Sequence, residues 1–137
     1  MRLFVFMLSL SLAAAAQAAE FTCPDEIDTT QKIANNVMGW DAFVDRQYNG
    51  ILESVSLYDG NPSQLADLKP DNGDTDETDL KWDFGATMKN LWMRCNYAHT
   101  RITLTQKLPD GYIKCTAERD KDMSVSGQPV FKKLVCE

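Results

Sequence analysis

The chain has 137 residues, 44% of them hydrophobic, and its 20 acidic residues outnumber its 14 basic ones, giving a net charge of −6. This length suits one domain with a modest hydrophobic core. An acidic chain is repelled by nucleic acids and by anionic membrane surfaces, so we expect neither as a partner, and a basic protein partner is favoured.

The first residues are typical of a secretory signal peptide. Arg2 precedes an apolar run over residues 3–16, and Ala16-Gln17-Ala18 fits a cleavage site between small residues. We predict a signal peptide over residues 1–18 and a single mature domain over residues 19–137. Removing Arg2 leaves 13 basic against 20 acidic residues, a net charge of −7.

The same apolar run indicates whether the chain inserts into a membrane and which compartment it reaches. It is too short and too rich in alanine for a confident membrane span, so we expect no membrane insertion after cleavage. An uncleaved anchor is the alternative. We expect the mature chain in the bacterial periplasm, with the cell exterior as the second choice.

All four cysteines, Cys23, Cys95, Cys115 and Cys136, follow the predicted cleavage site. An even number of cysteines behind a signal peptide predicts two disulfides and an oxidising compartment. A zinc site needs close pairs such as C-x-x-C, whereas consecutive cysteines here are 72, 20 and 21 residues apart. We therefore expect two disulfides, no metal and no cofactor.

The patterns before residue 50 are weak. Residues 25–37 favour a short strand or an irregular segment, and a helix is the alternative because Ile33, Ala34 and Val37 have helical spacing. Trp40 and Phe43 stand three positions apart, and we interpret them as anchors that fill one end of the core. An aromatic binding patch is the alternative.

Two strands are predicted on either side of a polar segment. Residues 51–58 alternate so that one face carries Ile51, Glu53, Val55 and Leu57. A short helical turn or loop is expected over residues 63–68. Residues 80–84 alternate as a half-buried strand whose inward residues are Leu80, Trp82 and Phe84.

Residues 69–79 are acidic and contain no large apolar side chain, which predicts an exposed loop. Asp74, Asp76 and Glu77 in this loop are candidate partner-binding residues. A calcium loop is the alternative, but the EF-hand pattern needs Gly at its sixth position and Glu at its twelfth, and neither starting point in this stretch provides both.

Residues 90–119 hold the densest strand pattern and predict a three-stranded antiparallel meander. Its first strand places on one face Leu91, Met93, Cys95 and Tyr97. The second strand points Ile102 and Leu104 toward the core, and Pro109-Asp110-Gly111 predicts a hairpin turn into a third strand. A polar loop over residues 119–128 and a last strand over residues 129–136 complete the chain.

The meander constrains the disulfides. Cys95 and Cys115 would lie on strands separated by a whole strand, about 9–10 Å apart. A disulfide needs Cα atoms closer than about 7 Å, so these two cysteines should not bond to each other. We predict the pairs Cys23–Cys95 and Cys115–Cys136, with Cys23–Cys115 and Cys95–Cys136 as the alternative.

The elements add up to six or seven strands and little helix. This count predicts a mainly β fold, either an antiparallel sheet or a small sandwich, stapled by two disulfides.

The residues for most enzyme mechanisms are missing. Nucleophilic catalysis needs a base beside the nucleophile, and the single histidine, His99, falls in a predicted turn. The sequence has no G-x-S-x-G, no H-E-x-x-H and no phosphate-binding glycine loop. Two carboxylates could serve a glycosidase, but 20 acids make such pairs unspecific. We expect no enzyme and no catalytic residue.

Arg94, Arg101 and Lys107 predict a small basic strip beside Trp92 on the outward face of the meander. The plain interpretation is a solvated sheet face. The alternative is a ligand or partner surface that includes Trp92.

Residues 92–97, WMRCNY, are followed by Thr100, by Leu108-Pro109 and by Cys115. This pattern resembles a family of small exported proteobacterial proteins with W-x-x-C-x-Y, x-x-T, L-P and a later cysteine. Further matching positions are Cys23-Pro24, Gly39-Trp40, Phe43, Leu104, Tyr58-Asp59-Gly60 and Cys136. Some members are encoded near type VI secretion genes, which is consistent with a periplasmic immunity protein. The resemblance implies no catalytic residues.

Our first hypothesis is therefore a non-enzymatic periplasmic protein that binds another protein, either as an immunity protein or as an inhibitor of a cell-wall hydrolase. The expected partner is a basic envelope hydrolase or toxin, because opposite charge speeds and orients association. The alternative is an envelope module that binds a small ligand in an aromatic pocket of Trp40, Phe43 and Trp92. A hydrolase that uses only carboxylates ranks last.

Overall fold

The computed structural model describes residues 18–43, 49–73 and 79–137. They form two antiparallel sheets and one short 3-10 helix, which confirms the mainly β fold. Nearly all of the predicted signal peptide lies outside these residues, so it stays a prediction. Within the described ranges, no helix is long and apolar enough to cross a membrane.

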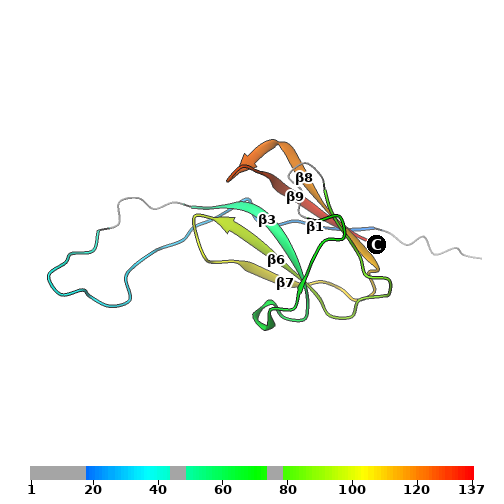
Figure 1. Cartoon of the computed structure of the whole chain (residues 1–137), viewed down its shortest axis with the longest axis horizontal. Helices are drawn as coiled ribbons and strands as arrows, with labels where there is room; N and C mark the ends of the chain where they lie inside the picture. The colour runs from blue at the N-terminus through cyan, green and yellow to red at the C-terminus, as the bar shows by residue number, and fades with distance from the viewer. Residues whose placement is uncertain (1–17, 44–48, 74–78) are drawn as a thin grey trace, which may run out of the picture.

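The first sheet has the strand order β1–β9–β8–β5, and the second has the order β2–β3–β6–β7, with β4 also paired to β3. The first sheet consists of β1 (Ala19–Phe21), β5 (Leu80–Asp83), β8 (Lys114–Val125) and β9 (Gln128–Cys136). The second consists of β2 (Glu26–Ile27), β3 (Gly50–Asp59), β4 (Asp67–Leu68), β6 (Leu91–Ala98) and β7 (Leu104–Lys107), with the 3-10 helix η1 (Pro62–Gln64) before β4. In Figure 1 the β8–β9 hairpin lies on the side of β3 away from β6 and β7.

The core forms where β3 packs against β9 and β8 of the other sheet. The alternation in β6 and β5 places the predicted residues inward, and the buried set includes Leu57, Leu80, Trp82, Leu91, Met93, Cys95, Tyr97, Ala117, Phe131 and Leu134. Burial of such side chains stabilises the fold by roughly 1.5–3 kcal/mol each relative to exposure. β5 and β6 belong to different sheets, so they supply opposite walls of the core.

Strand β3 contains a bulge that changes which residues face inward. Leu52 pairs with Tyr97 and Ser54 pairs with Asn96, so Glu53 is an extra residue in the strand. The prediction for Val55 and Leu57 is confirmed, because both are buried. The prediction for Ile51 is wrong: it is 40% exposed, and its neighbour Leu52 is buried instead.

The predicted three-stranded meander is wrong in its third strand. β6 pairs with β7 as expected, but β8 pairs with β5 and β9 in the other sheet. Residues 108–113 cross between the sheets instead of forming a hairpin. Leu108 is 2% exposed and its backbone N–H donates to Leu91 O at 2.9 Å, while the N–H of Gly111 donates to Met88 O at 2.8 Å.

Two further predictions near the meander are wrong. Leu104 is 38% exposed, because it lies on β7, a short edge strand paired only with β6 among the described strands. Ile102 precedes β7 and is 51% exposed. The loop expected over residues 119–128 is mostly strand, since β8 runs to Val125 and β9 begins at Gln128. Ser126 and Gly127 join them with φ of 52° and 82°, the pattern of a two-residue type I′ hairpin turn.

Both predicted disulfides are confirmed. Cys115 and Cys136 are register partners on β8 and β9, with Cα atoms 4.1 Å apart, and Cys23 is bonded to Cys95 with Cα atoms 6.0 Å apart. The reason given for keeping Cys95 and Cys115 apart needs correction, because they belong to different sheets rather than to two strands of one sheet.

Tyr97 also holds the segment after Cys23 to the second sheet. The Tyr97 hydroxyl donates to Pro24 O at 2.9 Å. Burial, and to a lesser degree the negative charge of Asp25, raises the pKa of Tyr97 above its ordinary value, so the phenol stays protonated and able to donate.

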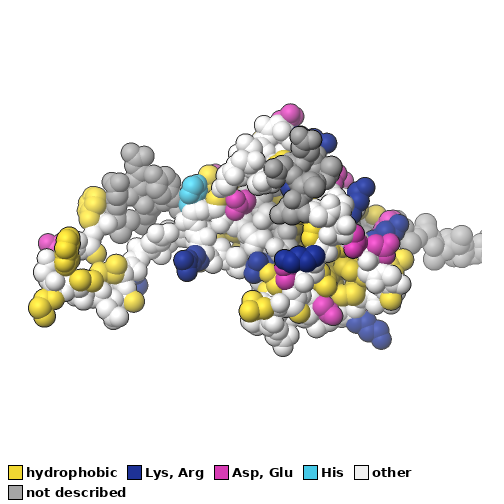
Figure 2. All heavy atoms as spheres, viewed as in Figure 1, with side chains coloured by type: hydrophobic (Ala, Val, Ile, Leu, Met, Phe, Trp, Pro, Cys, Tyr) yellow, Lys and Arg dark blue, Asp and Glu magenta, His cyan; other side chains and the backbone are white. Residues whose placement is uncertain are grey.

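Trp40 and Phe43 do not fill the core. They are 78% and 84% exposed, on a segment that connects β2 to β3 and reaches away from both sheets (Figures 1 and 2). The interpretation of these two residues as core anchors is therefore wrong.

Candidate functional site

One edge of β3 is partly uncovered. β6 runs along one edge, and the other edge pairs with β2 at residues 50–51 and with β4 at residues 57–58. Between these two short strands, and considering only the described ranges, no strand pairs with residues 53–56. The gap in the sheet exists because β2 and β4 each pair with only two residues of β3. The bulge at Glu53 lies at the start of the same stretch, in the pairing of β3 with β6.

A cavity of about 340 Å³ lies at this gap. Its apolar wall comes from both sheets and comprises Val55, Leu68, Pro70, Leu80, Trp82, Ala117, Pro129 and Phe131. Its polar lining comprises Glu53, Ser54, Ser56, Asp67, Lys69, Arg119 and Gln128. An apolar floor with a charged rim resembles the composition of protein and ligand binding sites.

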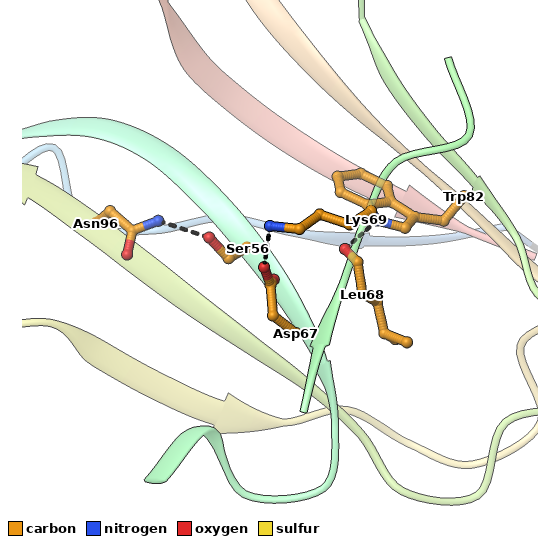
Figure 3. Close-up of polar contacts among 6 residues, drawn as sticks. All are labelled: Ser56, Asp67, Leu68, Lys69, Trp82 and Asn96. Atoms are coloured by element: carbon orange, nitrogen blue, oxygen red, sulfur yellow. Dashed lines mark hydrogen bonds and ion pairs between the residues drawn. The ribbon is translucent and has the colours of Figure 1, made fainter. Parts of the chain in front are cut away.

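Trp82 joins the two sheets across this cavity. Its indole N–H donates to the backbone carbonyl of Leu68 at 2.8 Å, so a side chain of β5 bonds to β4 of the other sheet (Figure 3). At the rim, Lys69 Nζ lies 2.6 Å from Asp67 Oδ2, with side chains 84% and 36% exposed. An ion pair this exposed contributes little to stability, and we read it as part of the accessible surface.

A second polar group extends the rim onto the outer face of β3 and β6. The Asn96 amide donates to Ser54 Oγ at 3.2 Å and to Ser56 Oγ at 3.0 Å, and Arg94 Nε donates to Asn96 Oδ1 at 2.9 Å. The Arg94 guanidinium also lies 4.8 Å from the ring centroid of Tyr58. These contacts hold the guanidinium of Arg94 against the sheet face.

The ends of the acidic segment are attached next to the cavity. Asp79 Oδ1 accepts the backbone N–H of Arg119 at 3.0 Å, and Asn72 Oδ1 accepts that of Lys81 at 2.9 Å. Arg119 itself lines the cavity. Asp74, Asp76 and Glu77 lie outside the described residues, and their role stays a prediction.

The remaining predicted residues are only partly brought together. Trp92 is half-buried on β6, its indole N–H donates to Asn90 Oδ1 at 3.4 Å, and it is the register partner of Lys107. Trp92, Arg94 and Lys107 thus share one sheet face, as predicted. Arg101 lies apart, beside His99 in a second cavity, between residues 99–102 and residues 29–32.

The chemical groups at the cavity suit binding. Ser54 and Ser56 line it, but His99 does not, and all four cysteines are in disulfides. Of the two carboxylates in the lining, that of Asp67 is paired with Lys69. In the part of the chain that the structure covers, no group of three or more potential metal ligands occurs.

Sequence reasoning missed the Ser54–Ser56–Asn96 cluster, Lys69, Arg119 and the cavity wall. Alternation puts Ser54 and Ser56 on the face of β3 opposite Val55 and Leu57, but this polar spacing alone does not identify Asn96 as their partner. The cavity forms only because two sheets meet at the gap in β3, and no local pattern encodes that meeting.

Comparison with known proteins supplies a family. The profile of the Type VI secretion system Tli immunity protein family matches residues 47–137, a range that contains every strand from β3 to β9. Comparison with curated proteins and with solved structures gave no significant match. Because the matched range is more than half of the chain, the chain belongs to the Tli immunity protein family of type VI secretion systems.

Proposed function

We propose that the chain is a non-enzymatic, exported immunity protein that binds a type VI effector in the periplasm and blocks its action. The family match over residues 47–137 carries this proposal. The two disulfides support the periplasmic location, because such bonds persist in oxidising compartments.

The cavity at the gap in β3 and its rim are the proposed contact surface. The wall presents apolar groups such as Trp82 and Phe131, and the rim presents Lys69 and the fixed Arg94. A protein side chain that enters an apolar pocket within a polar rim is the usual arrangement of a binding hot spot.

The negative charge of the chain supports a proposal about the class of effector. The predicted mature chain carries −7, and we propose that its partner is a basic hydrolase or toxin of the cell envelope, such as a cell-wall hydrolase. Opposite charges on the two proteins raise the association rate, and salt screens this effect. We propose that Asp74, Asp76 and Glu77 supply part of this attraction. The residues that flank them in the sequence, Asn72 and Asp79, are bonded next to the cavity.

The test is a calorimetric titration of the oxidised chain, residues 19–137, into the toxic domain of each effector encoded in its own secretion locus. We expect a 1:1 complex that weakens as salt rises. Replacing the three acids together (Asp74→Asn, Asp76→Asn, Glu77→Gln) should weaken binding roughly tenfold at low salt and flatten the salt dependence.

Two controls accompany this titration. A variant with Asp110→Asn, Asp120→Asn and Asp122→Asn removes the same charge elsewhere and should change binding less. If the two triple variants behave alike, only net charge matters and the acidic segment has no specific role. If no effector binds the parent chain, the immunity proposal itself fails.

The cavity also favours a second candidate, a module that binds a small envelope ligand. Its volume of about 340 Å³ lies in the range of small-molecule sites. Its aromatic residues would be Trp82 and Phe131, not the predicted set of Trp40, Phe43 and Trp92. Native mass spectrometry of the purified chain tests this candidate, and a mass equal to that of the bare chain would count against it.

A further inference from the structure

Residues 28–43, here called the apolar arm, leave the second sheet after β2 and reach away from the body of the protein (Figure 1). Every residue from 30 to 43 is exposed. The large apolar side chains among them are Ile33, Val37, Met38, Trp40 and Phe43, at 50%, 57%, 97%, 78% and 84% exposure. Figure 2 shows this concentration of hydrophobic side chains at one end of the molecule. Patches of this kind mark sites of interaction.

The arm is fastened at its root. The Cys23–Cys95 disulfide and the bond from Tyr97 to Pro24 fix the chain before it, and Gln31 Nε2 donates to His99 O at 3.2 Å. Near its tip, the N–H of Trp40 donates to Val37 O at 3.0 Å across a turn in which Gly39 has φ of +82°. The turn presents Met38 and Trp40 outward. A long connection with a fastened root and an apolar tip is typical of a binding loop.

We infer that the apolar arm inserts into an apolar cleft of the effector, and that Trp40 and Phe43 supply the main contacts. This inference rests on the proposed function, which supplies a protein partner. Aromatic residues dominate binding energy when a partner's pocket removes them from water. The projecting arm complements a concave surface of the effector. The cavity at β3 is concave and complements a projection. The arm and the cavity therefore contact different parts of the effector.

The charges of the arm disfavour a lipid surface as its target. Its only charged residues are Asp28, Lys32 and Asp41. Peptide segments that bind anionic bilayers combine apolar residues with several basic ones, and this arm has one. A protein cleft requires no such basic residues.

The family profile begins at residue 47, so the arm lies outside the matched range. The matched range covers the scaffold from β3 to β9. An element outside it can contact features of one effector without altering that scaffold. The arm therefore adds contacts with the effector to those that the scaffold makes.

The test compares two double variants in titrations with the same effector domains. Trp40→Ala with Phe43→Ala removes the arm's aromatic side chains, and Leu65→Ala with Met123→Ala removes exposed apolar side chains elsewhere, at 77% and 59% exposure. Both pairs are exposed, so both variants should keep the parent's unfolding midpoint. We expect the arm variant to bind roughly 100-fold more weakly and the control variant to bind within about threefold of the parent.

The possible outcomes separate the arm from the general function. If the parent binds and the arm variant binds equally well, the inference is overturned and the proposed function stands. If the parent sediments as a dimer and the arm variant is a monomer with unchanged effector affinity, the arm contacts a second copy and the inference is again overturned. If the parent binds no effector, the proposed function fails and the inference fails with it.

Discussion

Replacing Cys23 and Cys95 together by alanine is expected to lower the free energy of unfolding by about 4 kcal/mol in the chain-entropy account. This disulfide closes a loop with a sequence separation of 72, and it fastens the chain before β2 to the centre of β6. Without it, the unfolded chain gains conformational freedom, and β2 with the root of the arm loses its covalent tie. Equilibrium denaturation in urea, read by tryptophan fluorescence, measures the change.

The second disulfide is the matched control. Cys115–Cys136 closes a shorter loop, with a sequence separation of 21, so replacing both cysteines by alanine should cost about 3 kcal/mol in the same account. Replacing all four cysteines should leave much of the chain unfolded. The two losses together are comparable to the total stability of a typical domain, about 5–15 kcal/mol. A loss below about 1 kcal/mol for Cys23–Cys95 would contradict the view that this bond constrains the unfolded chain.

Replacing Trp82 by alanine is expected to lower the free energy of unfolding by about 3–5 kcal/mol. Trp82 is 3% exposed, lies in the core and bonds through its indole N–H to Leu68 of the other sheet. Alanine removes the apolar contacts and leaves an enlarged void beside the existing cavity. Thermal and urea unfolding measure the loss.

Trp82→Phe separates packing from hydrogen bonding. Phenylalanine keeps most of the apolar contact and loses the bond to Leu68, so we expect a loss of about 1–2 kcal/mol. If phenylalanine were as costly as alanine, the hydrogen bond between the sheets would outweigh the packing. If alanine cost less than about 1 kcal/mol, Trp82 would not join the two sheets, and the account of the cavity would be wrong.

The sequence predicted those parts of the fold that depend on local alternation and on covalent chemistry. Alternation at Leu91, Met93, Cys95 and Tyr97 assigned the inward face of β6 correctly, because side chains on a strand point to opposite faces in turn. The even number of cysteines correctly predicted two disulfides. Their correct pairing was derived from a meander whose third strand in fact belongs to the other sheet.

The parts that failed depend on partners distant in the sequence. Alternation says which face a residue occupies but not which strand lies next to it, so the crossing at Leu108 was misread as a hairpin turn. The bulge at Glu53 shifted Ile51 outward without a local signal. Trp40 and Phe43 have the composition of core residues, and only the tertiary structure places them on an exposed arm.

The candidate site was predictable only in part. Trp92, Arg94 and Lys107 follow from alternation and lie on one face. The cavity instead needs the gap between β2 and β4 on β3 and the packing of Trp82 and Phe131 from the other sheet. The family profile then supplied a functional class that no single motif contains.

The central claim, immunity exerted in the periplasm, is tested most directly by the survival of susceptible cells in which the effector's toxic domain is directed to the periplasm. Survival is compared between cells that produce residues 1–137 and cells that produce residues 19–137 without the predicted signal. We predict that only the chain of residues 1–137 restores growth, because only it reaches the compartment where its disulfides form and the toxin acts. Equal protection by the chain without residues 1–18 would contradict action in the periplasm, and no protection by either would contradict the immunity function.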